Sequence, residues 1–600
     1  MSVVAAMFLA AGDCSPGRAS DLPPAGRSLF DHLTSRRIDE RIEQRVPYPF
    51  QALLAELETR AGTDRLGRPG VAAVLIPLGR SLQRNASPGD YFAHPRIVAA
   101  ITGEVAAVTR AAPLLRDRIF LGFQDETGIV EVISYNERAG RFEFQVVTDY
   151  RRGATPKVFY ARRAVCTTCH HGAAPIFSRP SWDETNANPA VARALGVHAK
   201  SFHGVPVARG VDVPNAIDDA VARANRIALM QTIWRDGCAR VAAPNDPALC
   251  RAEALLAALR LRLTERLGRS VSEPAAADQL RILAAAWQAT WPDGLPEPDP
   301  NIPNRDPFFG GAQQLGITAA RLPYAADEIP PALDPMANRP PVAVWRADAA
   351  GIDRFVRTLA EMLAASDIAQ LARGLASRRA ASAPARPARL AGSEAFPAND
   401  HYDFDRLQHA LAALAADSRA GRSDVLGNAA FQRTPTLQAL FTHLGLPADS
   451  VCCDFDERAW PPARLEHDGI ENPAARSTPL EPFYEHCGVC HAGPSESPPG
   501  FLFGSAASVE RNLSRCAARI RYRLAMWRVA EGARAKVPMP PPVFVPSWNH
   551  APPHDALDRM VRYVDARLDA ATRERLLTLR YETLPACRES GGSIRRSARP

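Results

Sequence analysis

Residues 118–124 (RIFLGFQ), 128–135 (GIVEVISY) and 141–150 (RFEFQVVTDY) alternate apolar and polar side chains. Such an alternation, with a period of two, is typical of β-strands that bury one face. Turn-forming residues at 136–140 (NERAG) separate the last two runs, so a β-hairpin is predicted there. The segment 157–170 (KVFYARRAVCTTCH) follows, which places a Cys-x-x-Cys-His motif directly after a strand-rich region.

Helical periodicity dominates the rest of the chain. Apolar residues recur at i, i+3, i+4 and i+7, the pattern of a helix with one buried face. A mixed stretch of helix and loop over 21–100 precedes the strands, and a proline-punctuated, largely irregular stretch covers 292–345. The sequence therefore predicts a mainly α protein with an α+β N-terminal part. The predicted helices cover residues 37–46, 50–62, 216–237, 248–268, 276–291, 353–377, 403–416, 435–445 and 555–577.

Length and composition indicate several structural units, because 600 residues with 46% hydrophobic content exceed what one compact domain usually holds. The Ala/Pro/Ser-rich segment 381–392 (ASAPARPARLAG) is typical of a linker. We therefore expect an N-terminal α+β domain over 21–380, a linker over 381–400 and a mostly helical C-terminal domain over 401–600.

The N-terminal residues 1–12 (MSVVAAMFLAAG) are apolar enough for the central part of an export signal, although no basic segment precedes them. We expect residues 1–20 to be an export signal removed by ordinary cleavage or a lipoprotein-like segment; a lipid anchor at Cys14 and a retained N-terminus are the alternatives to ordinary cleavage. No later run reaches the roughly 18–20 apolar residues of a membrane span. These features favour a periplasmic protein, either unanchored or held to the membrane by lipid.

The formal charge of +7 comes from scattered arginines, and lysine occurs only at Lys157, Lys200 and Lys536. No basic stripe is interleaved with aromatic residues, so nucleic acid is not an expected partner. A mildly positive field favours an acidic redox partner.

Two Cys-x-x-Cys-His motifs carry the chemistry, at 166–170 (CTTCH) and 487–491 (CGVCH). Covalent attachment of haem needs two thiols for its two vinyl groups and an imidazole directly after the second thiol. Zinc is the main alternative, but zinc pairs normally have a second pair about 12–20 residues away, and neither motif has one. A thioredoxin-like site would need a βαβ context. We therefore predict two covalent haem c groups, with Cys166, Cys169, Cys487 and Cys490 as attachment points and His170 and His491 as iron ligands.

The second motif is followed by a proline-flanked methionine, Met539, in 537–542 (VPMPPP). A thioether in such a loop is a suitable sixth ligand that raises the reduction potential of haem iron. With CGVCH, Met539 and a C-terminal amphipathic helix carrying Tyr563 and Val564, residues 476–575 resemble the class I cytochrome c domain. The prolines before Cys487 depart from that pattern and leave room for only a short helix.

The first motif lacks a proline-flanked methionine close behind it. His203, Met230 or the more distant His94 could supply the sixth ligand, or the position could be open or bound to water. His171 is poorly placed, because its neighbour already occupies the proximal side. Near this motif, Trp182 and Trp234 are expected to be core residues rather than electron-hopping sites.

The remaining cysteines indicate an oxidising compartment. Cys238 and Cys250 flank a Pro/Asn/Asp loop and are expected to form a disulfide. Four others, Cys452, Cys453, Cys516 and Cys587, could form one or two more bridges, with buried free thiols as the alternative; their pairing stays open.

The motifs together favour a dihaem c-type cytochrome that transfers electrons between redox partner proteins and depends on a cytochrome c maturation machinery. The alternative is an enzyme similar to dihaem peroxidases or oxygenases, with an open first haem; in those families the motifs lie much closer together, so no catalytic residue is carried over. A haem-based sensor or scaffold lipoprotein is a third reading. The whole chain resembles the large dihaem cytochrome-like proteins of Gram-negative bacteria, a resemblance that implies no activity.

Overall fold

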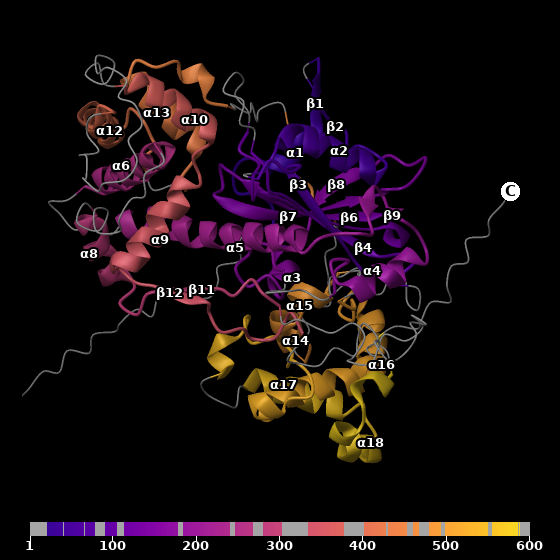
Figure 1. The fold of residues 1–600 in the computed structure, drawn as a ribbon. Helices are drawn as coiled ribbons and strands as arrows, with labels where there is room; N and C mark the ends of the chain where they lie inside the picture. The colour runs from indigo at the N-terminus through magenta and orange to yellow at the C-terminus, as the bar shows by residue number, and fades with distance from the viewer. Residues whose placement is uncertain are drawn as a thin grey trace, which may run out of the picture.

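The computed structural model describes residues 21–39, 41–64, 66–77, 91–104, 113–177, 184–239, 246–267, 280–302, 334–376, 401–427, 430–452, 460–466, 479–493, 498–549, 555–585 and 587. Within them the chain forms a mixed α+β unit and a helical C-terminal lobe (Figure 1). Residues 1–20 and 377–400, which hold the predicted export signal with Cys14 and the whole predicted linker, lie outside the described residues.

The centre of the N-terminal unit is a six-stranded sheet in which every strand pairs antiparallel with its neighbour in the chain. The predicted hairpin is confirmed, with Asn136 paired to Arg141 across the turn. Gly140 has a φ of +62° in this turn, a conformation that glycine adopts without strain. The strands are β3 (Val71–Ile76), β4 (Arg96–Ile101), β5 (Ile119–Gln124), β6 (Ile129–Asn136), β7 (Arg141–Thr148) and β8 (Lys157–Tyr160).

The stretch 21–100 contains more β-structure than predicted. β3 and β4 were missed, because the run VAAVLI of β3 is buried on both faces and so lacks the alternation of a one-sided strand. The helix predicted over 37–46 is wrong. That segment belongs to a hairpin of β1 (Ser35–Ile38) and β2 (Arg41–Gln44), in which Asp39 has a φ of +53° and reverses the chain.

The two faces of the sheet differ. One face packs against α1 (Leu29–Leu33) and α2 (Phe50–Ala61): Phe30 N donates to Ser134 Oγ, and Phe50 stacks on Phe123. The other face, which carries Phe144, meets α5 (Asp212–Thr232) and the first Cys-x-x-Cys-His motif. We call these the α2 face and the motif face.

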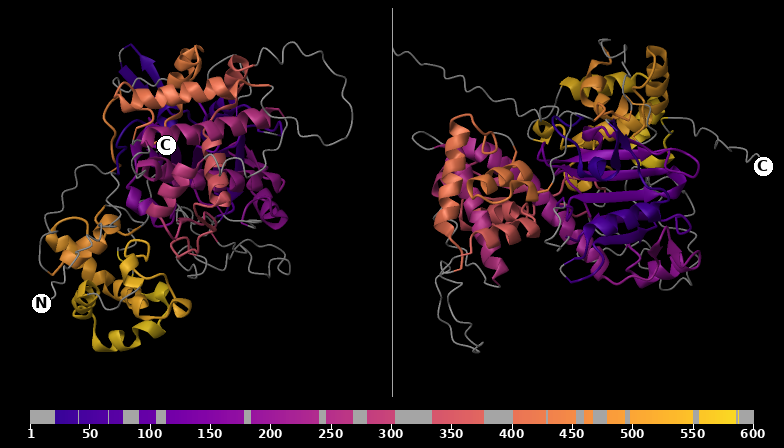
Figure 2. Two further views of the ribbon diagram at one scale, coloured as in Figure 1. Left: turned by 90° about the vertical axis from the view of Figure 1, so that its left-hand side faces the viewer. Right: turned by 90° about the horizontal axis from the view of Figure 1, so that it is seen from above.

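A group of helices extends the sheet unit on one side (Figure 2). One large hydrophobic core runs through the sheet and these helices up to Val451. The large core therefore continues past the predicted boundary at 381–400, and the hydrophobic clusters of the C-terminal lobe begin only at Leu480. The predicted helix 353–377 is two helices, since the Asp367 carboxylate accepts from Ala364 N and starts a new one. The helices are α6 (Pro247–Arg266), α8 (Arg281–Thr290), α9 (Ala349–Ala360), α10 (Ala365–Gly374), α12 (Phe404–Arg419) and α13 (Arg433–His443).

The C-terminal lobe has a core of its own, formed by residues between Leu480 and Val564. As expected, only a short helix precedes the second motif. Phe483 on this helix meets Tyr563 on the predicted amphipathic helix, with ring centroids 5.3 Å apart. The predicted helix 555–577 divides where Asp569 caps a new helix. The elements are α14 (Glu481–His486), α15 (Gly488–His491), α16 (Ala506–Ala525), α17 (Asp555–Asp565) and α18 (Ala570–Arg575).

Short elements connect these parts. They are α3 (Arg163–Thr167), α4 (Pro189–Gly196), β9 (Ser201–Phe202), β10 (Val205–Pro206), β11 (Leu295–Glu297), β12 (Ala343–Trp345), the 3-10 turns η1 (Asp125–Thr127), η5 (Ala448–Ser450), η8 (Met526–Arg528), η9 (Glu531–Ala533), η10 (Pro546–Asn549), η11 (Leu576–Thr578) and η12 (Tyr581–Thr583), and the π-helical turn η2 (Ile233–Gly237).

Each of the two units contains a disulfide. The predicted Cys238–Cys250 bridge is confirmed, and Cys516 pairs with Cys587 in the C-terminal lobe. These bridges fit an oxidising compartment outside the cytoplasm, such as the periplasm. Cys453 lies outside the described residues. Over the described part of the chain, no helix has the length and apolar character needed to cross a membrane.

Candidate functional site

The two Cys-x-x-Cys-His motifs lie side by side although they are far apart in the sequence. α3, which contains Cys166, packs against α15, which contains Cys490, where the C-terminal lobe meets the sheet unit (Figure 1). The thiol of Cys169 is close enough to add to the effect of burial in raising the pKa of Cys490 to about 12. The structure thus brings both predicted sites into one place.

Backbone pairing beside the motifs supports this contact. Tyr160 N, at the end of β8, donates to Arg464 O at 2.8 Å, and Glu466 N donates to Tyr160 O at 3.1 Å. The chain leading toward the second motif thereby pairs with the sheet edge that leads into the first. Chain segments that precede each of the two motifs therefore lie at the same edge of the sheet.

The two motifs share one local geometry. His170 N donates to Cys166 O at 3.0 Å, and His491 N donates to Cys487 O at 2.9 Å. Each motif therefore forms a single helical turn. Residues at i and i+3 of such a turn lie on one side, so the two thiols of each motif flank the same surface and the imidazole follows them.

The histidine rings of both motifs are held in the same tautomer. His170 Nδ1 lies 2.7 Å from Ala174 O, and His491 Nδ1 lies 2.8 Å from Pro499 O. A carbonyl oxygen only accepts hydrogen bonds, so Nδ1 must carry the proton in each ring. The Nε2 lone pair is left for a metal ion, the usual arrangement of a ligating histidine.

Burial keeps these side chains neutral. His170 and His491 are half-buried residues, and their dense surroundings lower the pKa of both rings to about 4. Burial also raises the pKa of the Cys487 thiol to about 12 and that of Cys166 above its usual range. None of the four motif cysteines is in a disulfide, so all four sulfurs remain available for attachment.

The first motif lies against the motif face of the sheet. The Phe144 ring meets the His170 ring edge-on, with centroids 5.4 Å apart. Beside it, Arg96 lies over Gly122 and reaches Glu131 at 2.5 Å. A Cβ on Gly122 would lie 2.1 Å from Arg96 Nη2, so only glycine leaves space for this guanidinium. The neighbouring apolar residues of this face, Val98, Ile133 and Val146, are only partly buried.

Side chains from distant segments hold the first motif in place. Arg339 donates to Cys169 O at 2.7 Å and to Asp299 O at 3.0 Å. Asn225 on α5 donates to Pro175 O at 2.7 Å, just beyond the motif. The segment that Arg339 attaches also carries Met336, a partly buried methionine that the sequence analysis missed. Met336 follows Pro335 much as Met539 follows Pro538, which makes it a further candidate for the sixth ligand.

The second motif is enclosed by residues close to it in the sequence. Phe501 stacks on the His491 ring with centroids 4.3 Å apart. A Cβ on Gly500 would lie 1.9 Å from Gly493 O, so glycine is required where the loop that presents Pro499 O passes the motif. On the attachment side, Met560 Sδ lies 4.0 Å from Cys487 Sγ.

Arg523 connects the predicted ligand Met539 with this motif. Met539 N donates to Arg523 O at 3.2 Å, and the charge of Arg523 contributes to the lowered pKa of His491. Trp527 Nε1 donates to Pro540 O at 3.2 Å and holds the other end of the methionine loop. Met539 and His491 are therefore both neighbours of one arginine.

The candidates for the sixth ligand of the first site are placed elsewhere. His203 packs edge-on against Phe123, with ring centroids 5.0 Å apart. Phe123 pairs with Val130, and Val130 with Val147, so Phe123 is on the α2 face, whereas Phe144 is on the motif face. His94 forms a hydrogen bond with Asp125, which follows the end of β5, and so its ring contacts Asp125 instead of the first motif.

Met230 and His171, which follow the first motif in the sequence, make other contacts. Met230 is fully buried in the large core. His171 donates from Nε2 to Thr168 O at 3.1 Å, within its own turn. Trp234 is a core residue as predicted, fully buried and packed against Phe431, and Trp182 lies outside the described residues.

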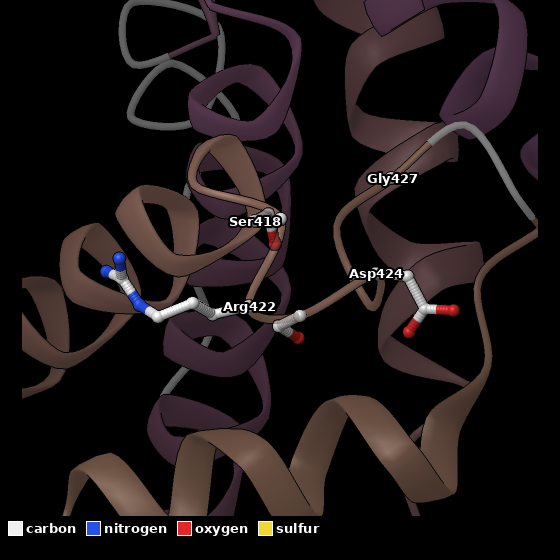
Figure 3. Close-up of a pocket in the computed structure, with 6 residues that line it drawn as sticks. Ser418, Arg422, Asp424 and Gly427 are labelled. Atoms are coloured by element: carbon white, nitrogen blue, oxygen red, sulfur yellow. The ribbon is translucent and has the colours of Figure 1, made fainter.

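A pocket lies away from both motifs, in the loop after α12 (Figure 3). Its lining includes Ser418, Arg422 and Asp424. Figure 3 shows the side chains of Arg422 and Asp424 pointing in opposite directions, and Arg422 is paired with Asp417. These groups do not converge on a common point, so the pocket is not the candidate site.

Comparisons of the chain with family models, with curated proteins and with solved structures found no match. The function is therefore inferred from the geometry of the motifs.

Proposed function

We propose that this protein is a dihaem c-type cytochrome that transfers electrons in the periplasm. One haem is attached at Cys166 and Cys169 and the other at Cys487 and Cys490. His170 and His491 are the proximal iron ligands, and Met539 is the sixth ligand of the second haem. When bound, haem c supplies reversible one-electron chemistry at its iron.

The contact between α3 and α15 carries the proposal. Two attachment motifs that lay far apart would serve two separate redox centres, whereas neighbouring motifs form one relay. The matching hydrogen bonds from His170 and His491 to backbone carbonyls support a shared role, because both rings present Nε2 to a metal in the same way.

Zinc is less well supported than haem. A zinc ion bound by both motifs would need at least three ligand atoms to converge. Among the described residues, the His, Cys, Asp and Glu ligand atoms that gather in threes or more within 4.8 Å belong to His94, Asp125 and Glu126, not to the motifs. Separate thiol pairs that each precede a metal-ready histidine suit covalent attachment of two haems.

The guanidinium of Arg523 is suited to bind the propionate groups of haem. Arg523 Nε and Nη2 are buried without a hydrogen-bond partner within the described structure, and Arg523 is a neighbour of His491. Arg96, whose charge acts on His170, also has a buried Nε without a hydrogen-bond partner within the described structure, but its Nη2 is already paired with Glu131. A buried unsatisfied guanidinium is costly unless an anion accepts from it, and a propionate would do so.

The methionine loop distinguishes the two sites. A histidine and methionine pair raises the potential of an iron and leaves no position for substrate, which suits electron transfer at the second haem. At the first haem, His203 lies on the α2 face of the sheet, away from Phe144 and His170. This placement argues against His203 as a ligand of the first haem; an open position there would allow a peroxidase- or oxygenase-like activity, which is the second candidate function.

Haem stoichiometry tests the proposal. The exported protein should contain two haems per chain by pyridine haemochrome assay, and Cys166→Ser/Cys169→Ser and Cys487→Ser/Cys490→Ser should each leave one. Cyanide or peroxide added to the single-haem forms separates the two functions: a shift of the first haem alone supports the enzyme, and two inert haems support the carrier. Wild-type protein that contains zinc instead of haem would overturn both.

A further inference from the structure

A group of histidines and carboxylates at the opposite side of the sheet has no role in the redox site. It gathers at the end of β5, where η1 follows Phe123 on the α2 face. Asp125 and Glu126 come from η1, His94 from the loop before β4, and His203 from the turn between β9 and β10. We propose that His94, Asp125 and Glu126, with His203 beside Asp125, bind a divalent transition-metal ion such as Zn²⁺.

The spacing of the ligand atoms matches a zinc site. Zinc binds imidazole nitrogen and carboxylate oxygen at about 2.0–2.2 Å, which puts neighbouring ligand atoms of a tetrahedron about 3.3–3.5 Å apart. His94 Nδ1 lies 3.1 Å from Asp125 Oδ2 and 3.5 Å from Glu126 Oε1. His203 Nε2 lies 3.6 Å from the same Asp125 oxygen. The ligand atoms of His94, Asp125 and Glu126 all lie within 4.8 Å of one another, so one zinc ion can bridge them. His203 is close to Asp125 but outside this group, and it would join the site by a movement of its side chain.

The donor set selects the class of metal. Imidazole nitrogen favours zinc, copper and related ions over magnesium and calcium, which prefer all-oxygen sites. The carboxylates supply the negative charge that a dication needs.

The backbone conformation of His203 directs its ring toward the carboxylate of Asp125. His203 has a φ of +47°, in the left-handed region that costs a residue other than glycine about 1 kcal/mol or more. Its ring meets Phe123 edge-on, which fixes its direction toward Asp125. The four side chains are each one-third to one-half exposed, so an ion can enter from solvent and keep a water molecule as a ligand.

The matched control is a histidine–carboxylate pair without further ligands. His443 Nε2 lies 3.0 Å from Asp417 Oδ2, and both side chains have 27% exposure, close to that of His94 and Asp125. This pair is shared with Arg422, whose cationic group disfavours a metal ion. It should not bind zinc strongly.

Equilibrium dialysis of the haem-containing full chain against Zn²⁺, followed by elemental analysis, tests the site. We expect about one zinc per chain in the wild type and in His443→Ala, and a loss of affinity of at least ~10–100-fold in His94→Ala and in Asp125→Asn. Glu126→Gln, at a half-exposed position that folding tolerates, should weaken binding in the same direction.

X-ray absorption at the zinc edge checks the ligands directly. The wild type should show two imidazoles on zinc and His203→Ala one. Equal zinc retention by the wild type and His94→Ala, or loss in His443→Ala alone, would overturn the proposal. Haem content is measured in the same samples and should be unchanged in all of them, so the outcome is independent of the redox assignment.

Discussion

The two Cys-x-x-Cys-His turns have the same backbone geometry but different surroundings. The first lies on a half-open sheet face and is held by Arg339 and Asn225, which come from distant parts of the chain. The second is enclosed by residues of its own lobe, with Phe501 stacked on His491. Under the proposed function, local sequence sets where a haem is attached, whereas the surrounding fold sets what its iron can do.

Met539→Ala should give the largest difference between the two sites. Removal of the thioether should abolish the methionine-to-iron absorption band of the second haem and lower its potential by a few tenths of a volt, with the first haem unchanged. Spectroelectrochemical titration measures both. Met560→Leu is the control, because Met560 lies beside the Cys487 thiol rather than in the methionine loop. A band that survives Met539→Ala would show that another residue is the ligand.

Arg433→Met tests whether the N-terminal unit includes the helices up to Val451. The Arg433 guanidinium and the Asp367 carboxylate form a buried double hydrogen bond at 2.7 and 2.9 Å between α13 and α10. Leaving Asp367 unpaired should cost about 3–5 kcal/mol. Because residues up to Val451 share the large core, the loss should appear in unfolding of the sheet unit and not of the C-terminal lobe.

Arg422→Met is the control, because it breaks an ion pair with Asp417 at the surface instead of a buried one. It should leave the free energy of unfolding unchanged. Thermal unfolding followed separately at the two haems distinguishes the units. Equal loss in both lobes after Arg433→Met would mean that they unfold as one.

Removal of each disulfide compares the stability of the two units. Cys516–Cys587 spans 71 residues and Cys238–Cys250 spans 12. By loop entropy, Cys516→Ala/Cys587→Ala should cost about 4 kcal/mol and Cys238→Ala/Cys250→Ala about 3 kcal/mol. Each loss should be confined to its own lobe in calorimetry; a reversed assignment would contradict the division into two cores.

Gly500→Ala and Gly122→Ala compare how much space the backbone leaves beside each of the two motifs. A Cβ at residue 500 meets the backbone oxygen of Gly493, which cannot move freely, so we expect a loss of about 1–3 kcal/mol and a disturbed second haem. A Cβ at residue 122 meets the end of the flexible Arg96 side chain, so the loss should be smaller. Gly532→Ala, with no atom nearby, should change neither spectrum nor stability.

Much of the fold was predictable where one segment carries its own signal. The β6–β7 hairpin and the long helices follow from periodicity and turn residues. β3 was not predictable in this way, because VAAVLI is buried on both faces, and the segment 37–46 misled because its isoleucines have helical spacing while Asp39 turns the chain back.

The candidate site was predictable only in its attachment residues. The cysteines and histidines lie within five-residue motifs and can be read directly. The contact of α3 with α15, the position of Arg523 between His491 and Met539, and the placement of His203 on the α2 face all depend on pairing between distant segments. No local pattern encodes such pairing.

The most direct test of the paired motifs is a redox titration of the wild type against the two single-haem variants. Two charges roughly 10–15 Å apart interact by about 1–2 kcal/mol at an effective dielectric constant near 20. Oxidation of one haem should therefore shift the potential of the other by about 50–80 mV, since ~1.4 kcal/mol corresponds to ~59 mV for one electron. A wild-type titration that equals the sum of the two variants would contradict adjacent haems.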